Sequence, residues 1–200
     1  KMGVTIDEPD KTTFVVTSCG KLQLPEQPLF LGNSGTAMRF LTAAVATVQG
    51  SVVLDGDDYM QKRPIGPLLT TLIQNGIRVD SPTGCPPVTV HGVGKVQAKR
   101  FKIDGGLSSQ YVSALLILAA YIESTIEVTL TGKDIGARGY VDLTLDCLRG
   151  FGAQVEVVDE TTWRVVSTGY TAHNYLIEPD ASAATYLWAA EVLTGGHIDI

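Results

Sequence analysis

Three stretches of the chain share one arrangement of polar and apolar positions, with small or polar residues directly before a long apolar run at helical spacing. They begin at Asn33, Gly106 and Pro179 and read NSGTAMRFLTAA, GLSSQYVSALLI and PDASAATYLWAA. Each start follows the previous one by 73 residues, so the stretches align without a gap. Because self-similarity at a fixed period is the signature of repeat architectures, the sequence predicts a repeated structural unit.

Each full copy of this unit shows the same elements after its first helix. In the first copy, an alternating run at residues 51–55 predicts a strand, and a second helix is expected from Pro64 to Gly76. Proline favours the first helical turn, and glycine favours the position just past the end. Two short strands at 77–80 and 88–91 follow, joined by a polar turn. The predicted order is β-α-β-α-β-β.

The second copy repeats this order. Residues 125–130 indicate a strand, residues 140–149 a helix that Gly152 stops, and residues 153–158 and 162–166 a strand pair. The predicted fold class is therefore α/β, built from repeated βαβαββ units.

Partial copies flank the complete ones. Residues 13–17 and 21–24 look like the closing strands of an earlier unit, and the third copy stops in the strand-like run 197–200. We expect residues 1–175 to form one compact domain and residues 176–200 to begin the next unit, leading into a second domain. Both ends read as cuts inside a larger protein, and no signal peptide is recognisable.

Composition excludes several classes of protein. The chain has 200 residues, of which 44% are hydrophobic and 18% charged, with a mean hydropathy of +0.17. It is too apolar for a disordered chain, and its apolar runs are too short for a membrane span. With 15 Lys and Arg against 21 Asp and Glu, the net charge of −6 has the wrong sign for nucleic-acid binding through phosphate neutralisation. Local geometry must therefore hold any bound anion.

The cysteines and histidines do not indicate covalent or metal chemistry. The three cysteines are widely spaced and include no CxxC pair, which argues against a disulfide framework or a zinc site. The three histidines share no ligand-like spacing and are expected to be structural or solvent-facing. We expect a reducing, cytoplasmic location, with no metal and no cofactor.

The first helix start is a candidate anion site. A strand end runs into a helix through residues 31–36, where two glycines allow close backbone approach and the free amides of the first turn favour negative charge. A plain turn capped by Ser34 or Thr36 explains the same pattern.

The second helix start carries two adjacent hydroxyls and an amide. Ser108, Ser109 and Gln110 can donate to phosphate oxygens. Alternatively, one serine caps the helix and the other is merely exposed. Because the equivalent position is polar in all three copies, we expect the helix starts to converge on one face.

A basic pair precedes the second helix of the first copy. A cation at a helix N-terminus opposes the macrodipole, so Arg63 needs an anionic partner. A bound carboxylate or phosphate would supply it, and so would an ion pair with Asp57 or Asp58. Tyr140 has the corresponding place in the second copy and is expected either to floor a ring-shaped ligand or to pack.

In order along the chain, these motifs resemble a known family. The chain contains LFLGNSGTAMRFLTAA, KRPIG, CPPVTVHG, DGGLSSQYVSALL, YVDLTL and PDASAATY, a series similar to that of the 5-enolpyruvylshikimate-3-phosphate synthases. The resemblance implies transfer of the carboxyvinyl group of phosphoenolpyruvate to the 5-hydroxyl of shikimate 3-phosphate, in aromatic amino acid biosynthesis. It also implies the enolpyruvyl transferase fold of two domains, each of three βαβαββ units with helix N-termini facing the cleft between the domains.

The resemblance assigns residues to both substrates. Shikimate 3-phosphate would be held by Ser108, Ser109, Gln110 and Tyr140. Phosphoenolpyruvate, with which glyphosate competes as an inhibitor in this family, would be held by Asn33, Gly35, Arg63 and Gln110.

Several positions depart from the family pattern. Phe40 replaces the usual proline behind the phosphoenolpyruvate loop and is expected to shift Gly35 and Thr36, altering glyphosate sensitivity. Ala137 replaces a serine that donates to phosphate, a loss for which Arg138 is expected to compensate. The family's catalytic Asp, its Lys–Glu pair and further arginines have no counterpart here. We therefore expect a substrate-binding part that needs the remaining domain and does not turn over alone.

Two other functions stay open. A UDP-N-acetylglucosamine enolpyruvyl transferase shares the repeated fold but commonly relies on a reactive loop cysteine, which the contexts of Cys85 and Cys147 do not suggest. The second alternative is a non-catalytic binding domain, with Phe40 and Ala137 as signs of divergence.

Overall fold

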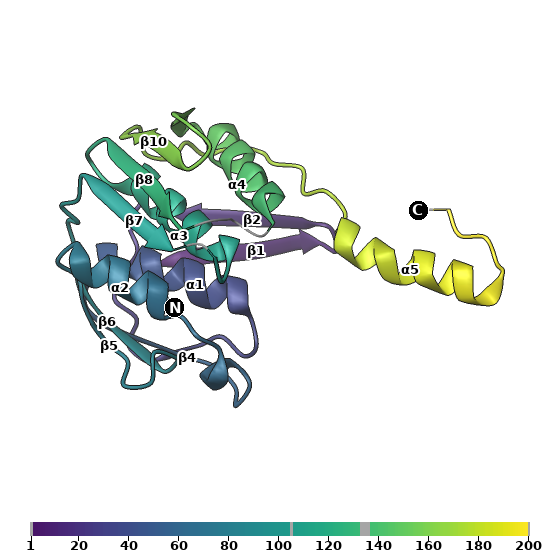
Figure 1. Cartoon of the computed structure of the whole chain (residues 1–200), viewed down its shortest axis with the longest axis horizontal. Helices are drawn as coiled ribbons and strands as arrows, with labels where there is room; N and C mark the ends of the chain where they lie inside the picture. Colours follow the sequence, from purple (N-terminus) through teal and green to yellow (C-terminus); the bar gives the residue numbers. More distant parts are fainter. Residues whose placement is uncertain (1, 105, 133–136, 200) are drawn as a thin grey trace.

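The computed structural model describes residues 2–104, 106–132 and 137–199. Two complete β-α-β-α-β-β units follow one another, with a two-stranded hairpin before them and a projecting helix after them (Figure 1). The hairpin consists of β1 (Val4–Asp10) and β2 (Thr13–Ser18), which pair antiparallel. The α/β class and the order of elements in the unit are confirmed.

The first unit forms a four-stranded sheet of order β3-β4-β6-β5. Strands β3 and β4 are parallel because a helix crosses over between them, whereas β4, β6 and β5 pair antiparallel. The elements are β3 (Leu29–Phe30), α1 (Gly35–Ala44), the 3₁₀ turn η1 (Val45–Thr47), β4 (Gln49–Asp55), the 3₁₀ turn η2 (Met60–Lys62), α2 (Gly66–Gln74), β5 (Arg78–Asp80) and β6 (Val88–Val93).

The second unit repeats this topology in a sheet of order β7-β8-β10-β9, with the same strand directions. Its elements are β7 (Arg100–Asp104), α3 (Ser109–Tyr121), β8 (Ile126–Thr131), α4 (Arg138–Gly150), β9 (Gln154–Val157) and β10 (Thr162–Val166).

A single hydrophobic core joins the two units. Helices α1 and α3 pack against each other, and α3 is buried along most of its length because it is apolar on nearly every face. In the sheets, alternate residues such as Val88 and Val90 of β6 point into this core. The packing of α1 on α3 therefore sets the relative position of the helix starts.

Helix α5 (Ala181–Thr194) projects from this body at the end of the irregular segment 167–180 and has no buried residue (Figure 1). A domain division near residue 175 stays a prediction. In the part of the chain that the structure describes, no helix is long and apolar enough to cross a membrane.

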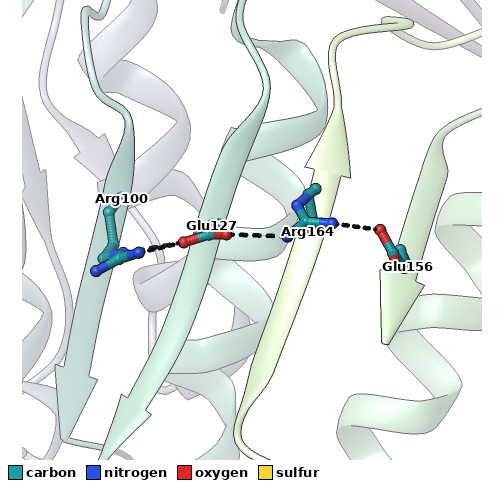
Figure 2. A network of polar contacts seen from close by, with 4 residues as sticks. All are labelled: Arg100, Glu127, Glu156 and Arg164. Carbon is teal, nitrogen blue, oxygen red and sulfur yellow. Dashed lines mark hydrogen bonds and ion pairs between the residues drawn. The ribbon is translucent and has the colours of Figure 1, made fainter. Parts of the chain in front are cut away.

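An alternating charge ladder crosses the second sheet. Figure 2 shows Arg100, Glu127, Arg164 and Glu156, which come from β7, β8, β10 and β9 in the order of the strands. Arg164 Nη2 lies 3.2 Å from Glu127 Oε1, and its Nη1 lies 2.7 Å from Glu156 Oε2. Hydrogen bonds from Arg100, and then from Arg164, lower the pKa of the Glu127 carboxyl.

Two expected strands are wrong. Residues 21–24 are irregular, because β2 pairs instead with the upstream β1 across a tight turn where Asp10 Oδ1 accepts a hydrogen bond from the Thr12 amide at 2.8 Å. Residues 197–199 are also irregular, because a strand needs a neighbour and the described residues offer this run none.

Helix boundaries also differ from those expected. Helix α2 begins at Gly66, so Pro67 and not Pro64 occupies its first turn. The N-cap residues of α1, α3 and α5 are Ser34, Ser108 and Asp180, which are 74 and then 72 residues apart. The ungapped spacing of 73 is therefore off by one residue at the central copy.

Candidate functional site

Two adjoining cavities open where the helix starts meet. The larger, of about 870 Å³, lies among the starts of α3, α4 and α5, and the smaller, of about 510 Å³, lies between the starts of α1 and α3 and the segment before α2. Both are lined by Thr36, Leu107, Ser108 and Gln110. The expected convergence of helix starts is therefore found, but the site is divided in two.

The start of α3 forms the wall between the cavities. The Ser108 side chain caps the helix by accepting a hydrogen bond from the Gln110 amide at 3.2 Å. Ser109 is only 6% exposed and lines the larger cavity. The alternative in which the second serine is merely exposed is therefore wrong. The Gln110 side chain reaches across to Thr36.

Two guanidinium groups converge at the start of α1. A Cβ added to Gly35 would lie 2.4 Å from Arg39 Nη1 and 2.9 Å from Arg63 Nη1. Gly35 is the first residue of the helix, where unpaired backbone amides and the macrodipole already favour negative charge. Two arginines at such a point can grip a carboxylate or a phosphate in bidentate fashion.

Arg39 is the side chain that the sequence reasoning missed. It is only 8% exposed, and its buried Nε has no hydrogen-bond partner among the described residues. Its Nη2 reaches the Pro64 carbonyl at the long distance of 3.4 Å. Burying an unpaired charge is unfavourable unless a partner or ligand compensates it. The sequence does contain a signal for this site residue, because Arg39 is a charged residue inside an apolar helical run, four residues after Gly35.

Arg63 lies in the short segment between η2 and α2 and lines the smaller cavity. The expected alternative, an ion pair with Asp57 or Asp58, is not among the ion pairs of the described residues. Asp57 Oδ1 instead accepts hydrogen bonds from the amides of Tyr59 and Met60, at 3.0 and 2.8 Å.

The remaining assigned residues divide between the cavities. Asn33 lines neither, because Ser34 caps α1 by accepting from the Ala37 amide at 3.3 Å and Asn33 stands ahead of it. Tyr140 lines the larger cavity, with its hydroxyl 3.5 Å from Ser182 Oγ at the start of α5. Phe40 also borders the larger cavity, away from the wall that Gly35 and the arginines form.

The start of α4 does not replace the missing serine hydroxyl. Ala137 stands ahead of α4 in the left-handed region, with φ at 72°. Arg138 Nη1 donates to the Glu160 carbonyl at 2.7 Å, and its side chain lines neither cavity. The expected compensation by Arg138 is therefore not found.

Both polar and apolar side chains line the larger cavity. The apolar ones include Ile117, Leu148 and Phe151, and Tyr170 also lines it, with its hydroxyl donating to the Ile117 carbonyl at 2.7 Å. Burial raises the pKa of the Tyr170 hydroxyl, which therefore stays protonated. Among the described residues, no group of three or more His, Cys, Asp or Glu side chains could hold a metal ion.

Comparison with solved structures supports this description of the fold. The EPSP synthase of Acinetobacter baumannii superposes with a TM-score of 0.77 at 25% sequence identity, covering 92% of this chain and 41% of that chain. The enolpyruvyl transferase NikO from Streptomyces tendae superposes with a TM-score of 0.50 at 19% identity over 74% of this chain, which is a likeness of fold.

Sequence comparison gives the family. A protein from Rhizobium leguminosarum bv. trifolii (strain WSM2304), named 3-phosphoshikimate 1-carboxyvinyltransferase, is 63% identical, and one of the same name from Pseudomonas savastanoi pv. phaseolicola (strain 1448A / Race 6) is 60% identical. These matches cover all of this chain but 47% and 48% of the relatives, so the chain spans about half their length. The family model described as EPSP synthase (3-phosphoshikimate 1-carboxyvinyltransferase) matches residues 1–200, and the chain therefore belongs to the EPSP synthase family.

Proposed function

We propose that this chain is the substrate-binding half of an enzyme that transfers the carboxyvinyl group of phosphoenolpyruvate to the 5-hydroxyl of shikimate 3-phosphate, releasing phosphate. The larger cavity takes shikimate 3-phosphate, with its phosphate at Ser108 and Ser109 and its ring against Tyr140. The smaller cavity takes phosphoenolpyruvate at Gly35, Arg63 and Arg39. The whole enzyme acts in the shikimate pathway to aromatic amino acids.

The main support for this proposal is the arrangement of charges in the smaller cavity. The Arg39 guanidinium is buried with an unpartnered Nε, and it shares the start of α1 with Arg63. The site thus holds two positive charges and a helix N-terminus, which suits a small ligand with both a carboxylate and a phosphate. Because both cavities meet at Gln110, two bound substrates would lie edge to edge, as transfer between them requires.

The reaction also needs a proton donor and a proton acceptor. A proton must reach the methylene carbon of the enol, and a base must accept the proton of the attacking hydroxyl. Among the described lining residues only Asp180 is acidic, and its carboxylate caps α5 by accepting from the Ser182 amide at 2.9 Å. We expect the acid and base to come from the remaining domain, and we expect this chain to bind shikimate 3-phosphate weakly without turnover.

Calorimetric titration of the chain tests the proposal. Shikimate 3-phosphate is expected to bind, UDP-N-acetylglucosamine is not, and Arg39→Ala or Arg63→Ala weakens phosphoenolpyruvate binding. The matched control is Lys62→Ala, which removes the same charge beside Arg63 from a side chain that lines neither cavity.

Two outcomes would contradict the proposal. Absence of heat with shikimate 3-phosphate, with and without glyphosate, would favour a non-catalytic domain of other function. Normal turnover by the chain alone in a coupled phosphate-release assay would show that the acid and base are present in it.

A further inference from the structure

The side chain of Tyr111 links the second repeat unit to the basic segment of the first. Tyr111 is the third residue of α3 and is only 1% exposed, yet it borders the smaller cavity. Its hydroxyl donates a hydrogen bond of 2.8 Å to the carbonyl oxygen of Pro64. A buried phenol with a well-placed acceptor fixes both groups, because either one would be costly to leave unpaired.

This bond constrains the arginine next to it. Pro64 directly follows Arg63, and the proline ring already restricts its own backbone. Holding the Pro64 carbonyl therefore fixes the short segment between η2 and α2 from which the Arg63 side chain leaves. That side chain ends at Gly35, opposite Arg39.

The same tyrosine also holds the second arginine. The Arg39 guanidinium carbon lies 5.8 Å from the centre of the Tyr111 ring, within cation–π range, and its Nη2 shares the Pro64 carbonyl at 3.4 Å. A carboxylate in that place would neutralise Arg39. An aromatic face attracts the cation without cancelling its charge, so the charge stays available to a ligand.

We propose that Tyr111 is a positioning residue for the phosphoenolpyruvate cavity, acting through Arg39 and Arg63. The inference rests on the proposed function for the identity of the ligand. The hydroxyl sets the backbone beneath Arg63, and the ring sets the plane of Arg39. Both arginines belong to the first unit and Tyr111 to the second, so the docking of α3 on α1 builds the anion site.

The test compares two tyrosines of the same helix. Tyr111→Phe removes the bond to Pro64 and keeps the ring. Tyr121→Phe is the matched control, because the Tyr121 hydroxyl also donates to a backbone carbonyl, that of Gly20 at 3.1 Å, and borders neither cavity. In titrations of the chain, Tyr111→Phe is expected to weaken phosphoenolpyruvate binding about three- to tenfold and to leave shikimate 3-phosphate binding within about twofold. Tyr121→Phe is expected to change neither.

A second measurement needs no ligand. In the unliganded chain, the Nε–H of Arg39 is buried and should give a resolved, slowly exchanging signal in a nitrogen–proton spectrum. Tyr111→Phe should shift the Arg39 and Arg63 signals, and Tyr111→Leu, which also removes the ring, should speed the exchange of the Arg39 proton. Tyr121→Phe should shift neither signal.

The outcomes separate the inference from the function on which it rests. Unchanged binding of both ligands by Tyr111→Phe, or an equal loss for both, would reduce Tyr111 to a structural role and overturn the inference. If the unchanged chain binds neither ligand, the proposed function fails. In that case the Arg39 and Arg63 signals alone test the positioning role of Tyr111. If Tyr111→Phe leaves both signals unshifted, that role is rejected.

Discussion

Gln110 Nε2 donates a hydrogen bond of 2.9 Å to Thr36 Oγ1, across the boundary between the two repeat units. Each residue is the second of its helix, α3 and α1, and each lines both cavities. An amide held in this way presents its carbonyl oxygen and its second N–H in fixed directions. One side chain can therefore contact ligands in both cavities at once.

Replacing Thr36 tests that relationship. Thr36→Val keeps the branched shape but removes the acceptor, so the amide is free to rotate. We expect about three- to tenfold weaker binding of both shikimate 3-phosphate and phosphoenolpyruvate, measured by calorimetry. Thr36→Ser keeps the hydroxyl and should retain most of the affinity. Losses of equal size in the two variants would contradict the role of the hydroxyl as an acceptor, because Thr36→Ser keeps it.

Gly35→Ala should displace the arginines without unfolding the chain. The new methyl group would meet the guanidinium ends of Arg39 and Arg63 and no backbone atom, so the displacement falls on the anion site more than on the fold. Phosphoenolpyruvate binding should weaken about tenfold, equivalent to about 1.4 kcal/mol, while the melting temperature stays nearly constant. Gly139→Ala, at the start of α4 where an added Cβ meets no atom, is the control. An unchanged affinity would show that the arginines do not contact the ligand.

Gly92→Ala should act on stability and not on binding. Gly92 pairs with Gly50 in the first sheet, and its Cβ would lie 2.1 Å from the Val48 carbonyl oxygen and 2.4 Å from that of Val45. Backbone atoms cannot swing away, so overpacking of about 1–3 kcal/mol or more is expected in urea unfolding. Gly66→Ala, at the open start of α2, should change stability by less than about 1 kcal/mol. A similar midpoint for both variants would contradict this explanation.

The charge ladder should make stability depend on pH. The pKa of Glu127 is lowered in the folded chain from its ordinary value of 4.5, first by Arg100 and then by Arg164. A depressed folded pKa stabilises the fold above the unfolded value, and this contribution is lost as the pH falls through the folded value. Glu127→Gln should therefore lower the melting temperature at pH 7 and flatten its decline below about pH 4.5.

Glu26→Gln is the control for that measurement, because none of the ion pairs among the described residues involves Glu26. High salt should reduce the difference between Glu127→Gln and the unchanged chain, since the ladder faces solvent. If the melting temperatures of Glu127→Gln and Glu26→Gln fall in parallel as the pH is lowered, the ladder adds nothing to stability.

The elements that the sequence predicted are those with a strong local pattern. The strand pairs at 77–91 and 153–166 alternate cleanly and carry turn residues between them, so their pairing could be inferred. Strand β1 could not, because residues 7–10 are acidic residues and a proline, which are typical of a loop, and their pairing with β2 is a tertiary outcome. The N-cap of α3 is displaced by one residue from the repeat, because the capping side chain is that of Ser108 and not of Leu107.

The sequence predicted which helix starts form the candidate site, but not that the site is divided into two cavities. Ser108, Ser109 and Gln110 stand at a helix start by sequence alone, but which cavity each one lines depends on how α1 packs on α3. That packing is a contact between residues about seventy positions apart, which no local pattern encodes. Arg39 was overlooked for the same reason, since only the packed helices bury it.

The bonds from Tyr111 to Pro64 and from Gln110 to Thr36 both run from the later half of the polypeptide to the earlier one. Severing the connection at residues 94–99 would yield two fragments, each with the strands of one sheet. The first fragment would keep Arg39 and Arg63, and the second would keep Tyr111, so neither would have the complete anion site. A small anion that binds between the two arginines would then favour reassociation of the fragments.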